Sequence, residues 1–222
     1  MGHRVSSQAK PVRRLSFFRT PRPWLAAFWK FSRTHTIIGT SLSVIGVIVI
    51  AWTEMPEGAL TPPLNLFSLL LPLIACLAGN GYIVGVNQIE DVEIDRINKP
   101  NLPIASGEFS RQDGWGIVLL AGALSVFLAV LGGWWLLTTV LLSLIIGSAY
   151  SMPPIRLKRF PFWASSCIMT VRGAVVNLGL FLLYRVQLGL PLGIPGKMLA
   201  LAACVLVFSI VIAIFKDIPD LE

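Results

Sequence analysis

Three polar residues recur at four-residue intervals in the stretch NQIEDVEIDRINKP, residues 87–100. If the apolar segment before them is a helix that continues outward, Asn87, Asp91 and Asp95 lie on one of its faces. Like charges at this spacing destabilise a bare helix, so a divalent cation suits them as a partner. Oxygen ligands favour Mg²⁺ or Ca²⁺, and Mg²⁺ typically joins one or two carboxylates to phosphate oxygens. The spacing predicts a metal–phosphate site; the alternative is a solvated helix end with ordinary surface acids.

Basic residues that follow later in the chain complete this prediction. Lys and Arg stabilise the negative charge that develops on a leaving diphosphate, so they suit a diphosphate clamp beside the metal. The alternative for each of them is a charge that only sets membrane topology. The candidates lie in the segments NKP and YSMPPIRLKR and are Lys99, Tyr150, Arg156, Lys158 and Arg159.

Several polar residues lie within or at the start of apolar segments. Arg172 is a functional candidate by position, because a charge inside a membrane span is costly. Asn80 and Asn177 either line the same cavity or form interhelical hydrogen bonds, and Asn177, five residues after Arg172, lies on a different helical face. Arg33 and His35 could hold an acceptor that bears a carboxylate; the alternative is anchoring at the membrane interface.

The elements that must position these residues are transmembrane helices. Of the 222 residues, 55% are hydrophobic and 13% are charged, whereas a soluble domain carries roughly 25% charged residues. A span needs about 20 apolar residues. We expect an all-α, polytopic bundle with a basic arm and interfacial helix at 1–35 and a membrane domain at 36–222. The predicted spans are 36–52, 64–86, 115–132, 134–150, 163–184 and 198–215.

The basic residues predict the orientation of this bundle. With six spans, all but three of the 18 Lys and Arg fall on one side. The positive-inside rule places that side in the cytoplasm. The same side receives the acidic stretch at 87–100 and a second one, KDIPDLE, at 216–222. The exceptions are Arg172, within a span, and Arg185 and Lys197 on the other side.

The three residues Asn87, Asp91 and Asp95 resemble the first aspartate motif of the UbiA-type membrane prenyltransferases. The longer stretch NQIEDVEIDRINKPNLPIASGEFS is similar to that of the branch acting on homogentisate. The blocks YSMPPIRLKRFP, VRGAVVNLGLFL and FKDIPDLE are similar to the later motifs of that branch. The likeness runs from about residue 30 to the last residue.

This resemblance implies a helical bundle of nine spans around a central cavity open to the cytoplasm, with two aspartate motifs that bind Mg²⁺ and a prenyl diphosphate. The diphosphate leaves, and the allylic cation is attacked by homogentisate, which loses CO₂; a phytyl donor would make this a step of tocopherol synthesis. Asp217 and Asp220 match the start of the second motif, and Lys99, Tyr150, Arg156 and Lys158 match positions that contact diphosphate. A cyanobacterial inner or thylakoid membrane is the expected location, with no nucleic-acid partner.

Two departures from the family pattern leave alternatives open. The chain ends before the next Gly-Asp of the second motif and before three further spans, so we expect either a fragment or a shortened copy. Thr34 stands where the family has proline. The alternatives are a relative that uses solanesyl diphosphate or a chlorophyll precursor, and an inactive remnant. A divalent-cation transporter is disfavoured, because every Asp and Glu falls outside the predicted spans.

Overall fold

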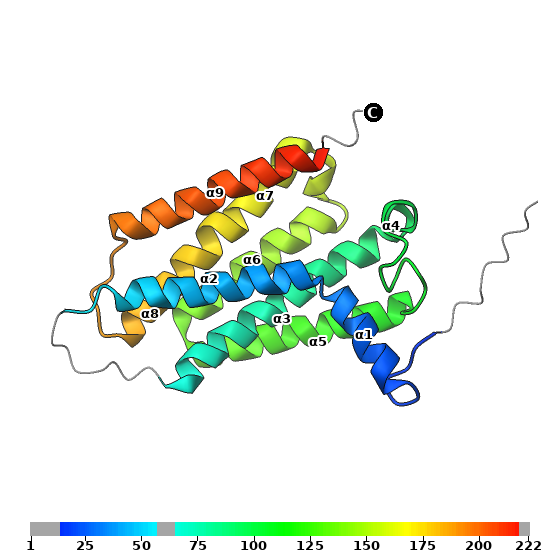
Figure 1. The fold of residues 1–222 in the computed structure, drawn as a ribbon, viewed down its shortest axis with the longest axis horizontal. Coiled ribbons are helices and arrows are strands. Elements are labelled where there is room, and N and C mark those ends of the chain that lie inside the picture. The colour runs from blue at the N-terminus through cyan, green and yellow to red at the C-terminus, as the bar shows by residue number, and fades with distance from the viewer. Residues whose placement is uncertain (1–13, 57–64, 218–222) are drawn as a thin grey trace, which may run out of the picture.

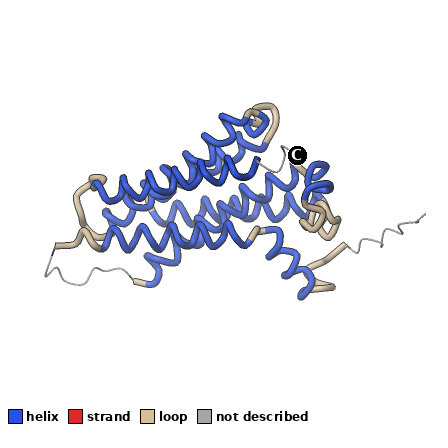
Figure 2. Tube along the Cα trace, turned by 45° about the horizontal axis from the view of Figure 1, so that its top comes forward, coloured by secondary structure: helices blue, strands red, loops and turns tan. Residues whose placement is uncertain are grey.

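The computed structural model describes residues 14–56 and 65–217, and no strand occurs among them, which confirms the all-α prediction (Figure 2). Side chains at the end of the last helix are described through Phe208 and at Val211. The helices, in chain order, are α1 (Pro21–Phe31), α2 (Thr34–Trp52), α3 (Leu66–Glu90), α4 (Val92–Asn98), α5 (Arg111–Gly132), α6 (Trp134–Ser151), α7 (Pro161–Met169), α8 (Val176–Gln187) and α9 (Gly196–Asp217).

Five helical segments of the described chain are long and apolar enough to cross a membrane. They are α2, α3, α5, α6 and the continuous helix Pro161–Gln187, in which a π-helical stretch at Thr170–Val175 joins α7 to α8. They match the first five predicted spans. The sixth coincides with α9, whose described part, Gly196–Phe208, is apolar but shorter. The predicted hairpin between spans three and four is also present, because Gly133 adopts φ +94° between α5 and α6.

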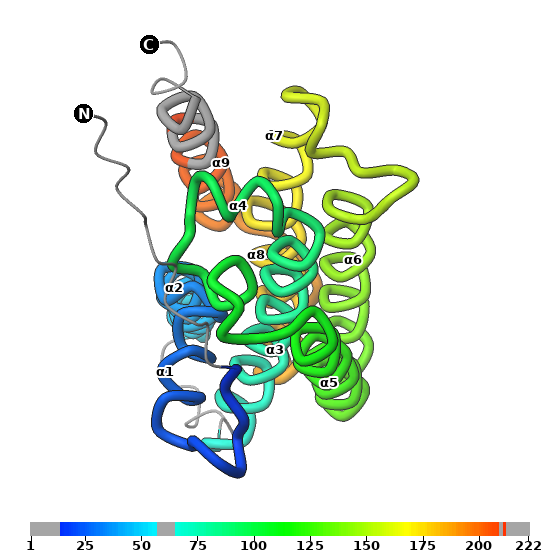
Figure 3. The backbone as a smooth tube through the Cα atoms, turned by 90° about the vertical axis from the view of Figure 1, so that its right-hand side faces the viewer, coloured from blue at the N-terminus to red at the C-terminus, as the bar shows by residue number. Residues whose placement is uncertain are grey.

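The long helices run side by side, and α3 packs against α2, α5 and α6 (Figures 1 and 3). Small residues permit this close approach, as is common between helices in membranes. A Cβ on Gly79 of α3 would lie 2.9 Å from Ser125 Oγ of α5, and one on Gly122 would lie 2.8 Å from the ring of Tyr82. Ser125 also donates a hydrogen bond to the carbonyl of Ala75 at 2.7 Å. The α3–α5 pair thereby forms a rigid support for whatever follows α3.

The buried apolar residues form two clusters along the bundle. The larger one joins α2, α3, α6, α8 and the start of α9, and includes Leu136, Leu180 and Tyr184. The smaller one lies beneath α4 and contains Phe31, at the end of α1, and Phe109 in the loop before α5, with ring centroids 6.1 Å apart. The smaller cluster therefore fixes α1 and the loop before α5 against the outer end of α3.

Helix α1 lies at an angle to α2, beside the end of the bundle that carries α4 (Figure 1). The two helices are separated by Ser32 and Arg33, and Arg33 has φ +49°. The structure therefore contains the helix predicted within the arm 1–35, while residues 1–13 of that arm lie outside the described residues. Its exposed apolar side chains include Leu25 and Trp29. Its position at the membrane interface stays a prediction.

Candidate functional site

The predicted metal ligands lie at the point where α3 passes into α4. The sequence predicts one helix that continues through them, and this prediction is wrong. Helix α3 ends at Glu90, and Asp91 adopts φ −106° and ψ 18° before α4 begins. The backbone bonds still follow the four-residue register, from Asp91 N to Asn87 O at 3.0 Å and from Asp95 N to Asp91 O at 2.7 Å. The bend therefore keeps the three side chains together, and Asn87 Nδ2 donates to Asp91 Oδ2 at 3.0 Å.

Asp91 is held by two cations from the loop between α6 and α7. Arg156 Nη2 lies 3.1 Å from Asp91 Oδ1, and Lys158 Nζ lies 2.7 Å from the same oxygen. The loop can reach inward because Arg156 adopts φ +41° just before a short 3₁₀ turn, Leu157–Arg159. Two candidates for the diphosphate clamp thus contact a candidate metal ligand directly.

Asp95 is held more loosely, by one cation from each side. Arg33 Nη2 lies 3.9 Å from Asp95 Oδ2 and donates to Asn87 Oδ1 at 3.4 Å, while Lys99 Nζ lies 3.7 Å from Asp95 Oδ1. Asp95 is only 4% exposed, yet its Oδ2 accepts no hydrogen bond from the described residues. A buried carboxylate oxygen without a donor is costly unless a further group binds it.

These residues together form what we call the polar cluster: Asn87, Asp91, Asp95, Arg33, Lys99, Arg156 and Lys158. The cations come from the turn before α2, the end of α4 and the loop before α7, so residues far apart in the sequence meet at one end of the bundle. Its two carboxylates face four cations. The cluster therefore has an excess of positive charge, which suits an anion that brings its own counter-cation.

The environment of Lys158 affects its protonation. Burial lowers the pKa of Lys158 below the ordinary lysine value, and the hydrogen bond and charge of Asp91 oppose that shift without cancelling it. Removal of Asp91 would therefore lower the pKa of Lys158 further, because Asp91 contributes most of the opposing effect. The charge of Lys158 depends on its carboxylate partner.

The donor set of the polar cluster fits Mg²⁺. Asn87, Asp91 and Asp95 offer only oxygen ligands, and the buried Asp95 Oδ2 has no donor of its own. No three His, Cys, Asp or Glu side chains gather as a metal-binding group within the described residues. Two carboxylates and an amide are nevertheless sufficient for Mg²⁺, which completes its shell with water and phosphate oxygens.

The other predicted residues occupy more varied places. Tyr150 lies at the end of α6, partly buried, and His35 is exposed in the first turn of α2. Asn80 Nδ2 donates to Thr36 Oγ1 at 2.9 Å, which is an interhelical hydrogen bond between α3 and α2. Asp217 is the last residue of α9, without a described side chain, and Asp220 lies outside the described residues. Figure 1 shows α9 ending at the same end of the bundle as α4.

Arg172 and Asn177 lie on different faces, as predicted from their spacing. Arg172 is exposed, whereas Asn177 is 1% exposed. Asn177 Nδ2 donates to the carbonyl oxygens of Arg172 at 2.8 Å and Gly173 at 3.4 Å, so its hydrogen bonds stay within its own helix. They satisfy carbonyls in the π-helical stretch, where the ordinary helical pattern is interrupted.

Gln88 was not identified by the sequence reasoning. It follows Asn87 and points about a quarter-turn away, into the smaller core, where it is 1% exposed. Its Nε2 donates to the backbone oxygen of Phe31 at 2.6 Å, two residues before Arg33. Gln88 therefore ties the α1–α2 turn, and with it the Arg33 guanidinium, to the helix that carries Asn87.

The profile of the UbiA prenyltransferase family matches residues 43–222. The chain is 53% identical over 199 residues to homogentisate phytyltransferase of Synechocystis sp., covering 89% of this chain and 64% of that protein. It is 41% identical over 203 residues to the chloroplastic homogentisate solanesyltransferase of Arabidopsis thaliana, covering 88% and 50%.

A solved structure shares the fold. The UbiA homologue from Archaeoglobus fulgidus bound to GPP and Mg²⁺ aligns with a TM-score of 0.65 at 20% identity, covering 82% of this chain and 60% of that one. The chain thus spans 64% of the length of the Synechocystis relative and 50% of that of the Arabidopsis relative.

Proposed function

Because this chain belongs to the UbiA prenyltransferase family, we propose that the protein transfers a long prenyl group, phytyl, from its diphosphate to homogentisate, with loss of CO₂. The observation that carries the proposal is the polar cluster, in which four cations surround two carboxylates at the end of apolar helices. A diphosphate with a long apolar tail complements that arrangement, because its head is anionic and its tail requires an apolar environment.

Asn87, Asp91 and Asp95 would hold Mg²⁺, and Asp217 and Asp220 are proposed to join them from the end of α9. The ion would neutralise part of the diphosphate charge and so make diphosphate a better leaving group. The Archaeoglobus relative, which is bound to GPP and Mg²⁺, supports this choice of ion. The unpartnered oxygen of Asp95 is the feature of this chain that supports it.

The cations of the polar cluster would bind the diphosphate oxygens. Arg156 and Lys158 now share Asp91 Oδ1, and Lys99 lies near Asp95. With Asp91 and Asp95 bound to a metal ion, these cations would be free to bind the phosphate oxygens instead. They then stabilise the negative charge that develops as the carbon–oxygen bond breaks. Tyr150 and Arg172 are proposed as further contacts to the diphosphate.

The transfer itself needs little covalent chemistry from the protein. The electron pair of the breaking carbon–oxygen bond leaves with diphosphate, and a ring carbon of homogentisate attacks the allylic cation. The ring gives up a proton, and the departing CO₂ is replaced by a proton on the side chain. Arg33, His35 and Asn80 are proposed to bind the acceptor, since they lie at or near the start of α2 beside the cluster. The surrounding helices would keep water from the cation.

The orientation of the bundle belongs to the same proposal. The polar cluster lies at the end of the bundle that carries most of the Lys and Arg, so the positive-inside rule puts it at the cytoplasmic face. We propose a bacterial inner or thylakoid membrane, of a cyanobacterial type, as the location. The similarity to a Synechocystis protein supports that choice.

The test is an assay of membranes that contain the protein expressed from its complete gene. Phytyl diphosphate, Mg²⁺ and homogentisate labelled in the carboxyl carbon should yield a prenylated quinol and an equal amount of labelled CO₂. Solanesyl and geranylgeranyl diphosphates, supplied in competition, separate the donor alternatives, and a chlorophyll precursor tests the other acceptor. The same assay on the 222-residue chain alone tests the inactive remnant. Absence of both products with every donor would disprove the proposed reaction.

A further inference from the structure

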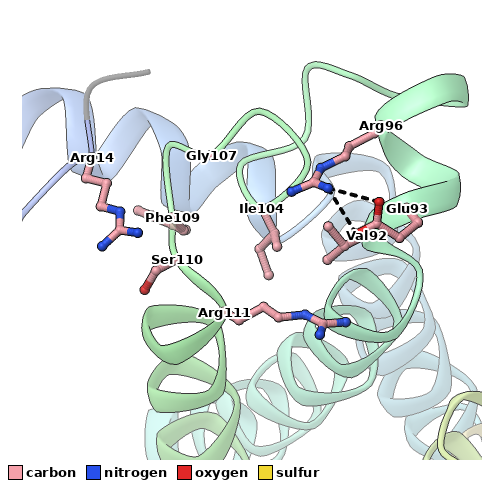
Figure 4. Close-up of a pocket in the computed structure, with 9 residues that line it drawn as sticks. All are labelled: Arg14, Val92, Glu93, Arg96, Ile104, Gly107, Phe109, Ser110 and Arg111. Atoms are coloured by element: carbon pink, nitrogen blue, oxygen red, sulfur yellow. Dashed lines mark hydrogen bonds and ion pairs between the residues drawn. The ribbon is translucent and has the colours of Figure 1, made fainter. Parts of the chain in front are cut away.

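A cavity separate from the polar cluster lies beside α4. It is a cavity of about 260 Å³ between α4, the loop before α5 and the segment that leads to α1 (Figure 4). Glu93 and Arg96 of α4 line it, whereas Asp95 of the same helix contacts Arg33 and Lys99 of the polar cluster. The two sites therefore share one short helix but not their residues. We call this cavity the arginine pocket.

Three arginines and one glutamate give the arginine pocket a net positive charge. Arg96 donates twice to Glu93, at 3.0 and 2.9 Å, so that pair is internally satisfied (Figure 4). Arg111 donates to the backbone oxygen of Ile89 at 3.1 Å. Neither Arg111 nor Arg14 has a carboxylate within ion-pair distance among the described residues. Two guanidinium groups on the wall of one cavity therefore lack an anionic partner.

The size and floor of the pocket limit its ligand. Val92, Ile104 and Phe109, which are 4%, 4% and 1% exposed, form an apolar floor beneath the arginines. Sites for drug-sized ligands have volumes of about 300–1,000 Å³, so a cavity of about 260 Å³ suits a small anionic group. A phosphate with a short polar substituent fits both the volume and the charge.

The pocket also lies at the ends of membrane-length helices, where lipid headgroups are expected. Arg111 is the first residue of the membrane-length helix α5, and Ile89, which it contacts, is next to the last residue of α3. Phe109 of the floor packs on Trp24 of α1, with centroids 5.6 Å apart. Trp29 of the same helix is 55% exposed. Exposed tryptophan and the ends of spans both mark the interface between bilayer and water.

We propose that the arginine pocket binds the phosphate headgroup of an anionic membrane lipid, whose acyl chains lie outside it in the bilayer beside α1. This binding goes beyond the proposed reaction and uses none of its residues. A phosphate bound by Arg14 and Arg111 would join the segment before α1 to the start of α5, where Arg111 also contacts Ile89 at the end of α3.

The experiment measures which lipid stays on the purified 222-residue chain. The protein is exchanged into detergent with equal amounts of phosphatidylglycerol and phosphatidylcholine, and retained lipid is counted by native mass spectrometry. The test variant is Arg14→Gln with Arg111→Gln. The control is Arg19→Gln with Arg22→Gln, which removes the same charge from exposed positions outside the pocket. A parallel arm adds millimolar inorganic phosphate.

We expect one phosphatidylglycerol to be retained in preference to phosphatidylcholine. The test variant should lower this retention about tenfold or more, because two charge-assisted hydrogen-bond donors to the phosphate are lost. The control should not lower it. Glu93→Gln, which removes the only pocket carboxylate, should increase retention and guards against loss by misfolding alone. Equal loss in the control would show general surface attraction and overturn the proposal. Displacement by millimolar phosphate would overturn the lipid as the source of the anion.

Discussion

Both ends of the helical bundle hold a carboxylate between two cationic side chains, yet only one of the two arrangements is suited to bind a ligand. At the end opposite the polar cluster, Glu54 lies 2.5 Å from Lys197 Nζ and 3.7 Å from Arg185 Nη1. These residues join the ends of α2 and α8 to the start of α9, and we call them the far-end clasp. Asp91 at the other end is held by two cations in the same way.

The cations of the far-end clasp have further partners within the protein. Arg185 Nε donates to the backbone oxygen of Pro191 at 2.6 Å, and its guanidinium lies 5.6 Å from the ring centroid of Phe181. Lys197 donates to Thr53 Oγ1 at 3.0 Å. In the polar cluster, by contrast, Arg156 and Lys158 have no side-chain acceptor besides Asp91 in the described part of the chain.

The difference shows what separates a structural ion pair from a ligand site. Distances are similar at both ends, so distance alone does not distinguish them. At the far end, the donors of each cation are distributed over protein acceptors, and an added anion would have to displace them. In the polar cluster, Arg156 and Lys158 have no described side-chain acceptor besides Asp91, so their remaining donors are available to an anion that arrives with a metal ion.

The largest contrast is expected from removal of one carboxylate at each end. Asp91→Asn should lower prenyl transfer on the order of 10²–10³-fold, because a group that stabilises charge in the transition state is lost. Glu54→Gln should leave turnover within a few-fold of the unchanged protein at a temperature where both are folded. The measurement is initial rate of prenylated quinol formation in membranes. Comparable losses in the two variants would remove the functional distinction between the ends.

Removal of the two cations from each end tests binding rather than turnover. Arg156→Gln with Lys158→Gln should raise the KM for the prenyl diphosphate about 10- to 100-fold, because both cations are proposed to bind the diphosphate oxygens. The KM for homogentisate should change little. Arg185→Gln with Lys197→Gln is the matched control, with the same change in net charge at the far end. An equal rise in the control would indicate a general electrostatic effect instead of a specific site.

The sequence was sufficient to predict the parts of the fold that depend on composition. Runs of apolar residues gave the first five spans, and the glycine at 133 marked the hairpin between α5 and α6. The four-residue spacing also predicted that Asn87 and Asp91 lie together, and their side chains are hydrogen-bonded although α3 ends between them. Regular local patterns are predictable because the backbone geometry of a helix transmits them.

The contacts between distant segments could not be predicted in the same way. Arg33 was assigned to the acceptor, yet it also reaches Asn87 and Asp95, because the turn after α1 adopts a left-handed conformation. Gln88 supports that turn by donating to the backbone oxygen of Phe31. Every residue type has such an oxygen, so the sequence does not reveal the partner. Such contacts depend on tertiary packing, which the spacing of residues along one helix does not encode.

The far-end clasp should matter most for stability. Glu54→Gln leaves Arg185, which is 8% exposed, without its carboxylate. Because Glu54 and Lys197 are partly exposed to water, we expect a loss of about 2 kcal/mol, below the 3–5 kcal/mol typical of fully buried pairs. Lys30→Gln, which breaks the exposed pair with Glu108, should cost less than about 1 kcal/mol. Thermal unfolding in detergent measures both, and a larger loss for Lys30→Gln would contradict the comparison.

The smallest expected effect is a shift in pH dependence that only the polar cluster should show. Burial lowers the pKa of Lys158, and Asp91 opposes that shift only in part. As pH rises, Lys158 therefore loses its proton below the ordinary lysine value of 10.5, and affinity for inorganic diphosphate should begin to fall there. Lys158→Arg should extend binding to higher pH, since arginine stays charged.

The measurement is a titration of inorganic diphosphate between neutral and alkaline pH, without added Mg²⁺ because its hydroxide precipitates. Asp91→Asn should move the fall in affinity to lower pH, since the group that raises the pKa of Lys158 is removed. Lys197→Arg, in the far-end clasp, should leave the profile unchanged. If Lys158→Arg and the unchanged protein lose affinity at the same pH, then Lys158 does not bind the diphosphate through its charge. Lys158 would in that case have a structural role, like the cations of the far-end clasp.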